Sequence, residues 1–150
     1  VHVPLVLRWP TRFAQGVRRH ALVELTDLAP TLLECCGIEI EPQMQGRSMR
    51  PLLEDEHLPD TFRDDVYCEY TNSWTHHRSY GSMLRTREHK LVVYHGLDDG
   101  ELYDLRSDPD EFVNLWDEPM VADVKLALLR RLFDRSVFTM DPLPERLGPF

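Results

Sequence analysis

The stretch "SMLRTREHKLVVYHGLDDGELYDL", residues 82–105, predicts a run of short antiparallel strands. Two interruptions, around Arg87–His89 and at "GLDDG", have the composition of tight turns, so we interpret Asp98 and Asp99 as turn residues. "DVYCEY" (Asp65–Tyr70) alternates apolar and polar side chains and adds a half-exposed strand. These segments together predict a sheet of about four antiparallel strands.

A long helix follows the predicted sheet, from Pro119 to about Phe138. Proline suits a first helical turn, and the apolar residues recur every three to four positions. The predicted stripe consists of Val121, Val124, Leu128 and Leu132. We therefore expect residues 59–150 to form a small α+β subdomain in which this helix packs on the sheet.

The residues before residue 59 have a different pattern, one typical of an α/β domain. "PLVLRW" (Pro4–Trp9) is apolar on both faces apart from Arg8, which is typical of a strand covered on both sides in an α/β sheet. "TDLAPTLLECCG" (Thr26–Gly37) predicts a helix with an apolar stripe, and Met49–Leu53 a single helical turn. The stripe consists of Leu28, Leu32 and Cys36, with Leu33 beside it.

One strand and one helix cannot close a domain, because a buried parallel strand needs neighbours at both edges. We therefore expect residues 1–58 to be the end of a larger α/β domain whose other strands lie upstream. In the isolated chain, we expect self-association through the exposed segment 3–9 or disorder in residues 1–58.

Composition narrows the possible partners. The 150 residues carry 17 Lys and Arg against 26 Asp and Glu, a net charge of −9, which argues against nucleic acid or an anionic membrane surface as a partner. No apolar run is long enough to cross a bilayer. The three cysteines, Cys35, Cys36 and Cys68, do not give a disulfide framework or a metal knuckle, and we interpret them as buried thiols.

The most suggestive candidate site is the loop "TNSWTHHRSYG", residues 71–81. Adjacent histidines seldom ligate one metal ion, so we expect no metal site here and propose instead contacts to a substrate. The candidate substrate-binding residues are Trp74, His76, His77 and Arg78. The alternative is a solvated polar loop.

Two further charged groups have simple interpretations. Arg85, Arg87, His89 and Lys90 surround a predicted hairpin, as exposed strand charges or as contacts to an anion. Asp64 and Asp65 precede a strand and are expected to be solvated.

Five segments in order resemble the C-terminal part of the sulfatase family, in the alkaline-phosphatase-like superfamily. They are "VPLVLRWP", "LTDLAPTLLECCGI", "MQGRSMRPLL", "MLRTREHKLVVY" and "ELYDLRSDPDEFVNL". The resemblance covers nearly the whole chain. It implies that residues 1–58 are the last strand and helix of a large α/β domain, and that residues 59–150 are a four-stranded antiparallel sheet packed on one long helix.

The resemblance also implies a chemistry. Sulfatases hydrolyse sulfate esters with a formylglycine, made from the Cys or Ser of a C/S-x-P-x-R motif, and a calcium ion. No cysteine here has that context, and Ser107-Asp108-Pro109 is followed by Glu111 where the motif has Arg. No catalytic or metal-binding residue can therefore be assigned to this chain.

We thus expect a fragment of a sulfuric ester hydrolase that is inactive alone, whose parent acts on a small-molecule or saccharide sulfate ester. One alternative is a phosphonate or phosphate monoester hydrolase of the same superfamily, and another is a non-catalytic interaction module. The sequence leaves the compartment open between periplasm and cytoplasm.

Overall fold

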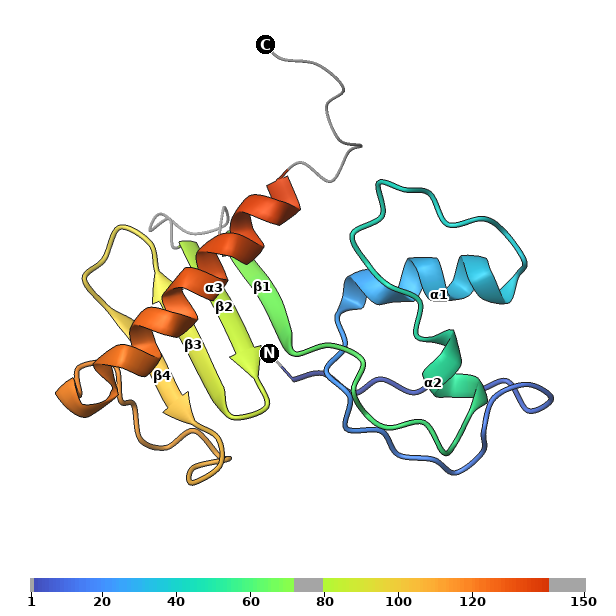
Figure 1. Cartoon of the computed structure of the whole chain (residues 1–150), viewed down its shortest axis with the longest axis horizontal. Coiled ribbons are helices and arrows are strands. Elements are labelled where there is room, and N and C mark those ends of the chain that lie inside the picture. The colour runs from blue at the N-terminus through green and yellow to red at the C-terminus, as the bar shows by residue number, and fades with distance from the viewer. Residues whose placement is uncertain (1, 72–79, 141–150) are drawn as a thin grey trace, which may run out of the picture. The chain divides into compact units, whose positions relative to one another are not determined.

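The computed structural model of the chain describes residues 2–71 and 80–140 (Figure 1). It divides into two compact units, residues 1–62 (unit 1) and residues 63–150 (unit 2). The division lies four residues after the boundary expected from the sequence. Each unit is described by itself.

Unit 2 contains one antiparallel sheet whose strand order follows the chain, β1-β2-β3-β4. The strands are β1 (Asp65–Thr71), β2 (Tyr80–Thr86), β3 (His89–Tyr94) and β4 (Gly100–Asp104). In the register of the three last strands, Leu91 lies opposite Leu84 on one side and Leu102 on the other. The predicted four-stranded antiparallel sheet is confirmed.

The helix that covers the sheet is α3 (Ala122–Met140), which follows a short 3-10 turn, η2 (Pro119–Val121). Figure 1 shows α3 lying across one face of the sheet. Leu84, Leu91 and Leu102 are at most 1% exposed and pack with Leu128 and Leu132 of α3. The predicted helix on the sheet is confirmed, and its apolar stripe is the face that it buries.

The edge strand β4 is completed by the loop that leads to α3. The side-chain oxygen of Asn114 accepts from the backbone N–H of Leu102 at 3.0 Å, and its amide nitrogen donates to the Gly100 carbonyl at 3.0 Å. Trp116 lies over Gly100 so closely that a Cβ there would meet the indole ring at 2.5 Å. Asn114 thus pairs the strand edge, and Gly100 provides the space for Trp116.

The regular elements in the described residues of unit 1 are short helices: η1 (Leu25–Asp27), α1 (Leu28–Cys35) and α2 (Arg50–Glu54). Residues 2–9 form no strand, so the predicted strand Pro4–Trp9 is absent from this structure. Val6 is 88% exposed, and Val3 and Leu5 are exposed as well. The reason is that a strand needs a partner, and the described residues of unit 1 include no other strand.

The first helix buries a different face from the predicted apolar stripe. Leu32 is 59% exposed and Cys36 is exposed too, whereas Asp27, Thr31 and Cys35 are buried. The buried side is set by the returning chain: the Thr31 hydroxyl donates to the Asp27 carbonyl at 2.6 Å and accepts from the N–H of Met49 at 2.9 Å. Polar capping contacts, and not the leucines, orient this helix.

Asp27 is the centre of this arrangement and is fully buried. One of its carboxylate oxygens accepts from the N–H of Glu24 at 2.7 Å and the other from the N–H of Arg47 at 2.8 Å. Next to Arg47, Gly46 lies against the Thr26 carbonyl so tightly that a Cβ would come within 1.9 Å of its oxygen. The "LTD" segment therefore ties the start of α1 to the chain before α2.

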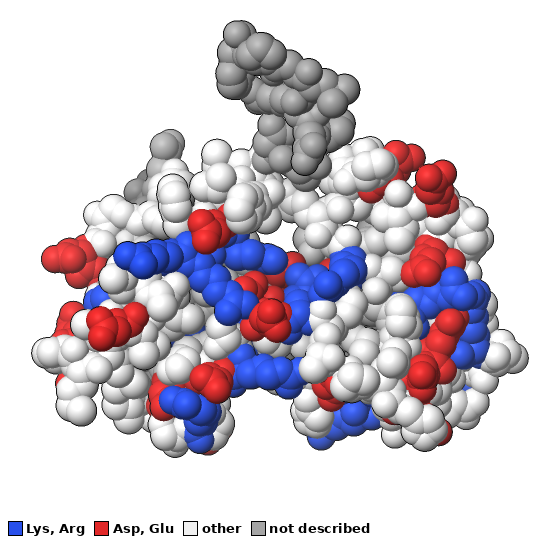
Figure 2. All heavy atoms as spheres, in the orientation of Figure 1, with Lys and Arg blue, Asp and Glu red and all other residues white. Residues whose placement is uncertain are grey.

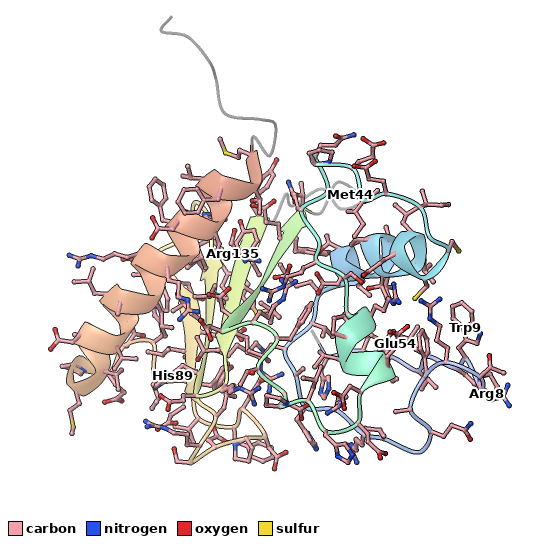
Figure 3. All side chains as sticks on the ribbon, turned by 45° about the vertical axis from the view of Figure 1, so that its right-hand side comes forward. Arg8, Trp9, Met44, Glu54, His89 and Arg135 are labelled. Carbon is pink, nitrogen blue, oxygen red and sulfur yellow. The ribbon has the colours of Figure 1, made fainter. Side chains whose placement is uncertain are left out.

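Ion pairs and capping contacts complete unit 1. The Arg19 guanidinium donates to the carbonyls of Leu52 and Leu58, at 3.1 and 2.7 Å, and so caps the end of α2. Glu54 of α2, labelled in Figure 3, accepts from Arg12 and from Arg50. Unit 1 is thus held mainly by charged and polar side chains that contact the backbone.

Candidate functional site

The predicted substrate-binding residues Trp74, His76, His77 and Arg78 lie outside the described residues. The structure does fix the ends of their segment, because Thr71 of β1 pairs with Tyr80 of β2. The two residues that flank segment 72–79 therefore lie at the same end of the sheet. In an antiparallel sheet of this order, the β3–β4 turn lies at that same end.

A polar network lies at this end of the sheet. Ring atom Nε2 of His95, which follows β3, lies 2.7 Å from the Oγ of Ser82, and the backbone N–H of His95 donates to the Tyr80 carbonyl at 2.8 Å. On the neighbouring strand β1, the Tyr67 hydroxyl donates to the Glu69 carboxylate. Ser82 is only 6% exposed, whereas His95 and Glu69 are exposed.

Burial raises the pKa of Tyr67, the hydrogen bond to Glu69 raises it further, and hydrogen bonds with Ser136 and Ser82 oppose that rise. The pairs His95–Ser82 and Tyr67–Glu69 lie on neighbouring strands at this end of the sheet, and we call these four residues the His95 network. The hydrogen bond to Ser82 can orient the imidazole of His95 toward a polar ligand.

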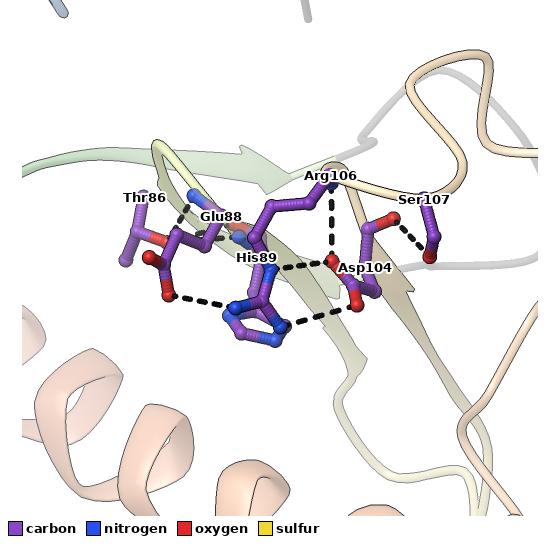
Figure 4. A network of polar contacts seen from close by, with 6 residues as sticks. All are labelled: Thr86, Glu88, His89, Asp104, Arg106 and Ser107. Carbon is purple, nitrogen blue, oxygen red and sulfur yellow. Dashed lines mark hydrogen bonds and ion pairs between the residues drawn. The ribbon is translucent and has the colours of Figure 1, made fainter.

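A second network occupies the opposite end of the sheet, at the β2–β3 turn (Figure 4). The Arg106 guanidinium donates to Asp104 at 3.1 and 3.2 Å and lies 3.8 Å from Glu88. Hydrogen bonds from the side chain and backbone of Arg106 lower the pKa of Asp104 to about 2. The Thr86 hydroxyl accepts from the N–H groups of Glu88 and His89 and closes the turn. This network has the contacts of a structural hairpin.

The predicted basic cluster does not converge on one site. Arg85 and Lys90 are register partners and share one face of the sheet, while His89 belongs to the other face. Lys90 donates to Glu111 and lies 5.6 Å from the centre of the Tyr103 ring. In Figure 2, basic side chains on the visible face are interleaved with acidic ones. This arrangement favours the interpretation as strand charges.

Of the two acidic pairs, Asp64–Asp65 was expected to be solvated and Asp98–Asp99 to lie in a turn, and the structure differs from the first expectation. Asp65 is 7% exposed and not solvated, because Arg131 and Arg135 of α3 reach it; the Arg135 Nε lies 3.6 Å from its carboxylate (Figure 3). Asp64 is exposed. In the predicted "GLDDG" turn, Asp99 accepts from the N–H of Gly100 at 2.8 Å.

The interpretation of all three cysteines as buried thiols is wrong for two of them. Cys35 is buried, Cys68 is half-buried and Cys36 is exposed. Within residues 2–71 and 80–140, no group of three or more His, Cys, Asp and Glu side chains could hold a metal ion. No helix in those ranges is long and apolar enough to span a membrane.

The sequence interpretation missed the His95 network. Ser82 and His95 are thirteen residues apart, and only the strand register brings them together. One signal was available: Ser82 is two residues before Leu84, so it lies on the face of β2 that packs on α3. A buried hydroxyl on that face needs a hydrogen-bond partner.

The family described as N-sulphoglucosamine sulphohydrolase, C-terminal, matches residues 1–137. An N-acetylglucosamine-6-O-sulfatase of Bacteroides thetaiotaomicron is 33% identical over 135 residues, which cover 87% of this chain and 24% of the relative. Human arylsulfatase K is 32% identical over 124 residues, 76% of this chain and 22% of the relative. The chain thus spans about a quarter of the length of these relatives.

Solved structures agree with the sequence relatives. A protein in complex with its substrate, D-glucosamine-2-N,6-O-disulfate, has a TM-score of 0.78 and 28% identity, over 94% of this chain and 29% of that chain. A phosphonate monoester hydrolase from Silicibacter pomeroyi has a TM-score of 0.69 and 27% identity, over 81% of this chain and 26% of that chain.

Proposed function

This chain belongs to the sulfatase family, and from that membership we propose that it is the C-terminal part of an enzyme that hydrolyses a sulfate ester of a saccharide. The observation that carries this proposal is the likeness, over 94% of the chain, to a protein solved with a sulfated glucosamine as substrate. The N-acetylglucosamine-6-O-sulfatase similarity supports the same class of substrate.

The residues of this chain do not fit the two groups that sulfatase chemistry requires. No Cys or Ser stands in a C/S-x-P-x-R context, and the described residues contain no cluster that could bind calcium. We propose that the formylglycine and the calcium ligands belong to the rest of the parent protein. The 150-residue chain alone should then release no sulfate, with or without added calcium.

The role proposed for unit 2 is to present one wall of the substrate pocket. The ladder between β1 and β2 fixes the ends of segment 72–79, and that segment supplies Trp74, His76, His77 and Arg78. Aromatic rings stack on sugar faces, and imidazole and guanidinium groups bind sulfate or hydroxyl groups. These four residues are proposed substrate contacts, not catalytic groups.

The direct test uses the full-length parent protein with a glucosamine 6-O-sulfate and measures released sulfate. We expect hydrolysis by the parent, and a lower kcat/KM for the His77→Ala variant. A parent that releases no sulfate from any saccharide or aryl ester contradicts the proposal. An unchanged kcat/KM in His77→Ala contradicts only the role given to segment 72–79.

A second candidate is hydrolysis of a phosphonate monoester, and the similarity to the Silicibacter pomeroyi enzyme favours it. The groups that select between sulfur and phosphorus esters are the nucleophile and the metal site, and both lie outside this chain. Parallel assays of the parent with phenyl phosphonate and aryl sulfate esters distinguish the two. A kcat/KM that is higher for the phosphonate would identify phosphonate monoester hydrolysis, and not sulfate ester hydrolysis, as the main activity of the parent.

A further inference from the structure

Two contacts with β2 hold His95 in one place. The backbone N–H of His95 donates to the Tyr80 carbonyl at 2.8 Å, and Nε2 of its ring lies 2.7 Å from the Oγ of Ser82. Ser82 is 6% exposed, so its hydroxyl is fixed within the packed part of unit 2. The imidazole itself is exposed to solvent. An exposed ring anchored through one nitrogen presents its other nitrogen in a fixed direction.

The contact with Ser82 uses Nε2 of the ring and leaves Nδ1 for another partner. A hydroxyl can donate or accept, so Ser82 can hold either neutral tautomer of the ring, and Nδ1 then accepts or donates accordingly.

No residue that the structure describes bonds to Nδ1 of His95. A ligand group that can both donate and accept suits either tautomer of the ring, and the hydroxyl groups of a sugar are of this kind. The ring also lies beside the Thr71–Tyr80 pair that bounds segment 72–79.

We propose that His95 is a specificity residue in the parent enzyme, where Nδ1 forms a hydrogen bond with a hydroxyl group of the saccharide. Ser82 is the positioning residue that holds the ring. This inference rests on the proposed function. His95 would give unit 2 a second substrate contact besides segment 72–79, placed at the turn between β3 and β4.

The test compares two substrates of the full-length parent: D-glucosamine-2-N,6-O-disulfate and a small aryl sulfate that lacks the sugar. We expect His95→Ala to lower kcat/KM about tenfold on the saccharide, mainly through KM, because one hydrogen bond is lost. The aryl sulfate should be unaffected. His95→Asn, whose side-chain amide can donate or accept in place of Nδ1, should retain more activity on the saccharide than His95→Ala.

The matched control is His89→Ala, because His89 begins β3 at the opposite end of the sheet from His95; this variant should leave the activity on both substrates unchanged. Ser82→Ala should reproduce part of the His95→Ala defect, again only on the saccharide. If the His95→Ala variant and the unmutated enzyme have equal activity on the saccharide, the role proposed for His95 is overturned, while the proposed function of the parent enzyme stands. Equal losses on both substrates also overturn it, because they indicate a structural role. A parent inactive on every sulfate ester overturns both the inference and the proposed function.

Discussion

Unit 1 and unit 2 are stabilised by different kinds of contact. In unit 2, leucines from three neighbouring strands and from α3 form one core, and β2 and β3 are each paired on both edges. In unit 1, the fully buried centre includes a carboxylate, Asp27, and a hydroxyl, Thr31. Among the described residues, its buried apolar side chains are Pro30, Cys35, Met49 and Leu52.

Both units leave apolar side chains exposed, among them Met120 in unit 2, so the difference lies in what each unit buries. In unit 1, several apolar side chains lie exposed beside a polar centre. Val6 is 88% exposed, Leu25 68%, Leu32 59% and Ile38 55%. Unit 2 has the sheet and covering helix from which small domains are built, so its own residues can fold it. We infer that unit 1 takes its missing cover from the remainder of a larger α/β domain. The predictions below test this contrast, from the largest expected effect to the smallest.

The largest effect should come from Leu91→Ala in unit 2. Leu91 is fully buried between two strands and α3, so its truncation should lower the free energy of unfolding of unit 2 by about 2–5 kcal/mol. Urea unfolding followed by NMR signals of the sheet measures this. Leu32→Ala in unit 1 is the matched control and should change stability by less than about 0.5 kcal/mol. Similar losses from both variants would remove the contrast.

The second effect concerns the polar centre of unit 1. Asp27→Ala leaves the part-buried N–H groups of Glu24 and Arg47 without their acceptor, at a cost of about 1–3 kcal/mol. Faster amide exchange at Arg47 should report the loss. Asp55→Ala, which removes an exposed acceptor for the N–H of His57, should leave the Arg47 amide unchanged. Unaltered exchange in Asp27→Ala would show that Asp27 does not hold this segment.

The third effect tests the proposed self-association of the isolated chain through residues 3–9. Val6→Asp places a charge in that exposed apolar segment and should weaken association by about tenfold, since burying a valine contributes about 1.5 kcal/mol or more. Sedimentation velocity over a concentration series measures it. Met120→Asp, at a residue of unit 2 that is 95% exposed, is the control. A chain that is monomeric at every concentration contradicts the proposal.

The smallest effect is a pH dependence within unit 2. Arg106 lowers the pKa of Asp104 from its ordinary 3.8 to about 2. Because the folded pKa is the lower one, this contact stabilises the fold above about pH 4 and is lost as the pH falls toward 2. Arg106→Gln should raise the pKa of Asp104 toward 3.8, as followed by NMR titration of its carboxyl carbon. Arg130→Gln serves as a control, and a pKa that stays near 2 in Arg106→Gln rules out Arg106 as the cause.

The sequence predicted unit 2 well because local patterns decide it. Alternation placed the strands within one or two residues, and the stripe around Leu128 and Leu132 is the face that α3 buries. Unit 1 was less predictable. The segment Pro4–Trp9 has strand composition, but strand formation depends on a partner, and α1 is oriented by the polar contacts of Asp27 with a segment twenty residues away.

The candidate site was also hard to predict, because it depends on contacts between residues that are far apart in the sequence. Asp65 was expected to be solvated, since nothing near it in the sequence indicates that Arg131 will reach it from α3. The His95 network depends on strand register, which the sequence does not show. The candidate residues of segment 72–79 were identified by residue type alone, and they remain a prediction.

The central claim is that unit 2 is self-sufficient and unit 1 is not. Amide hydrogen exchange of the 150-residue chain tests it most directly. We predict strong, uniform protection at Leu84, Leu91 and Leu102, and exchange close to that of an unfolded peptide across residues 3–9. Protection of residues 3–9 at the level of Leu91, in a monomeric sample, would contradict the account.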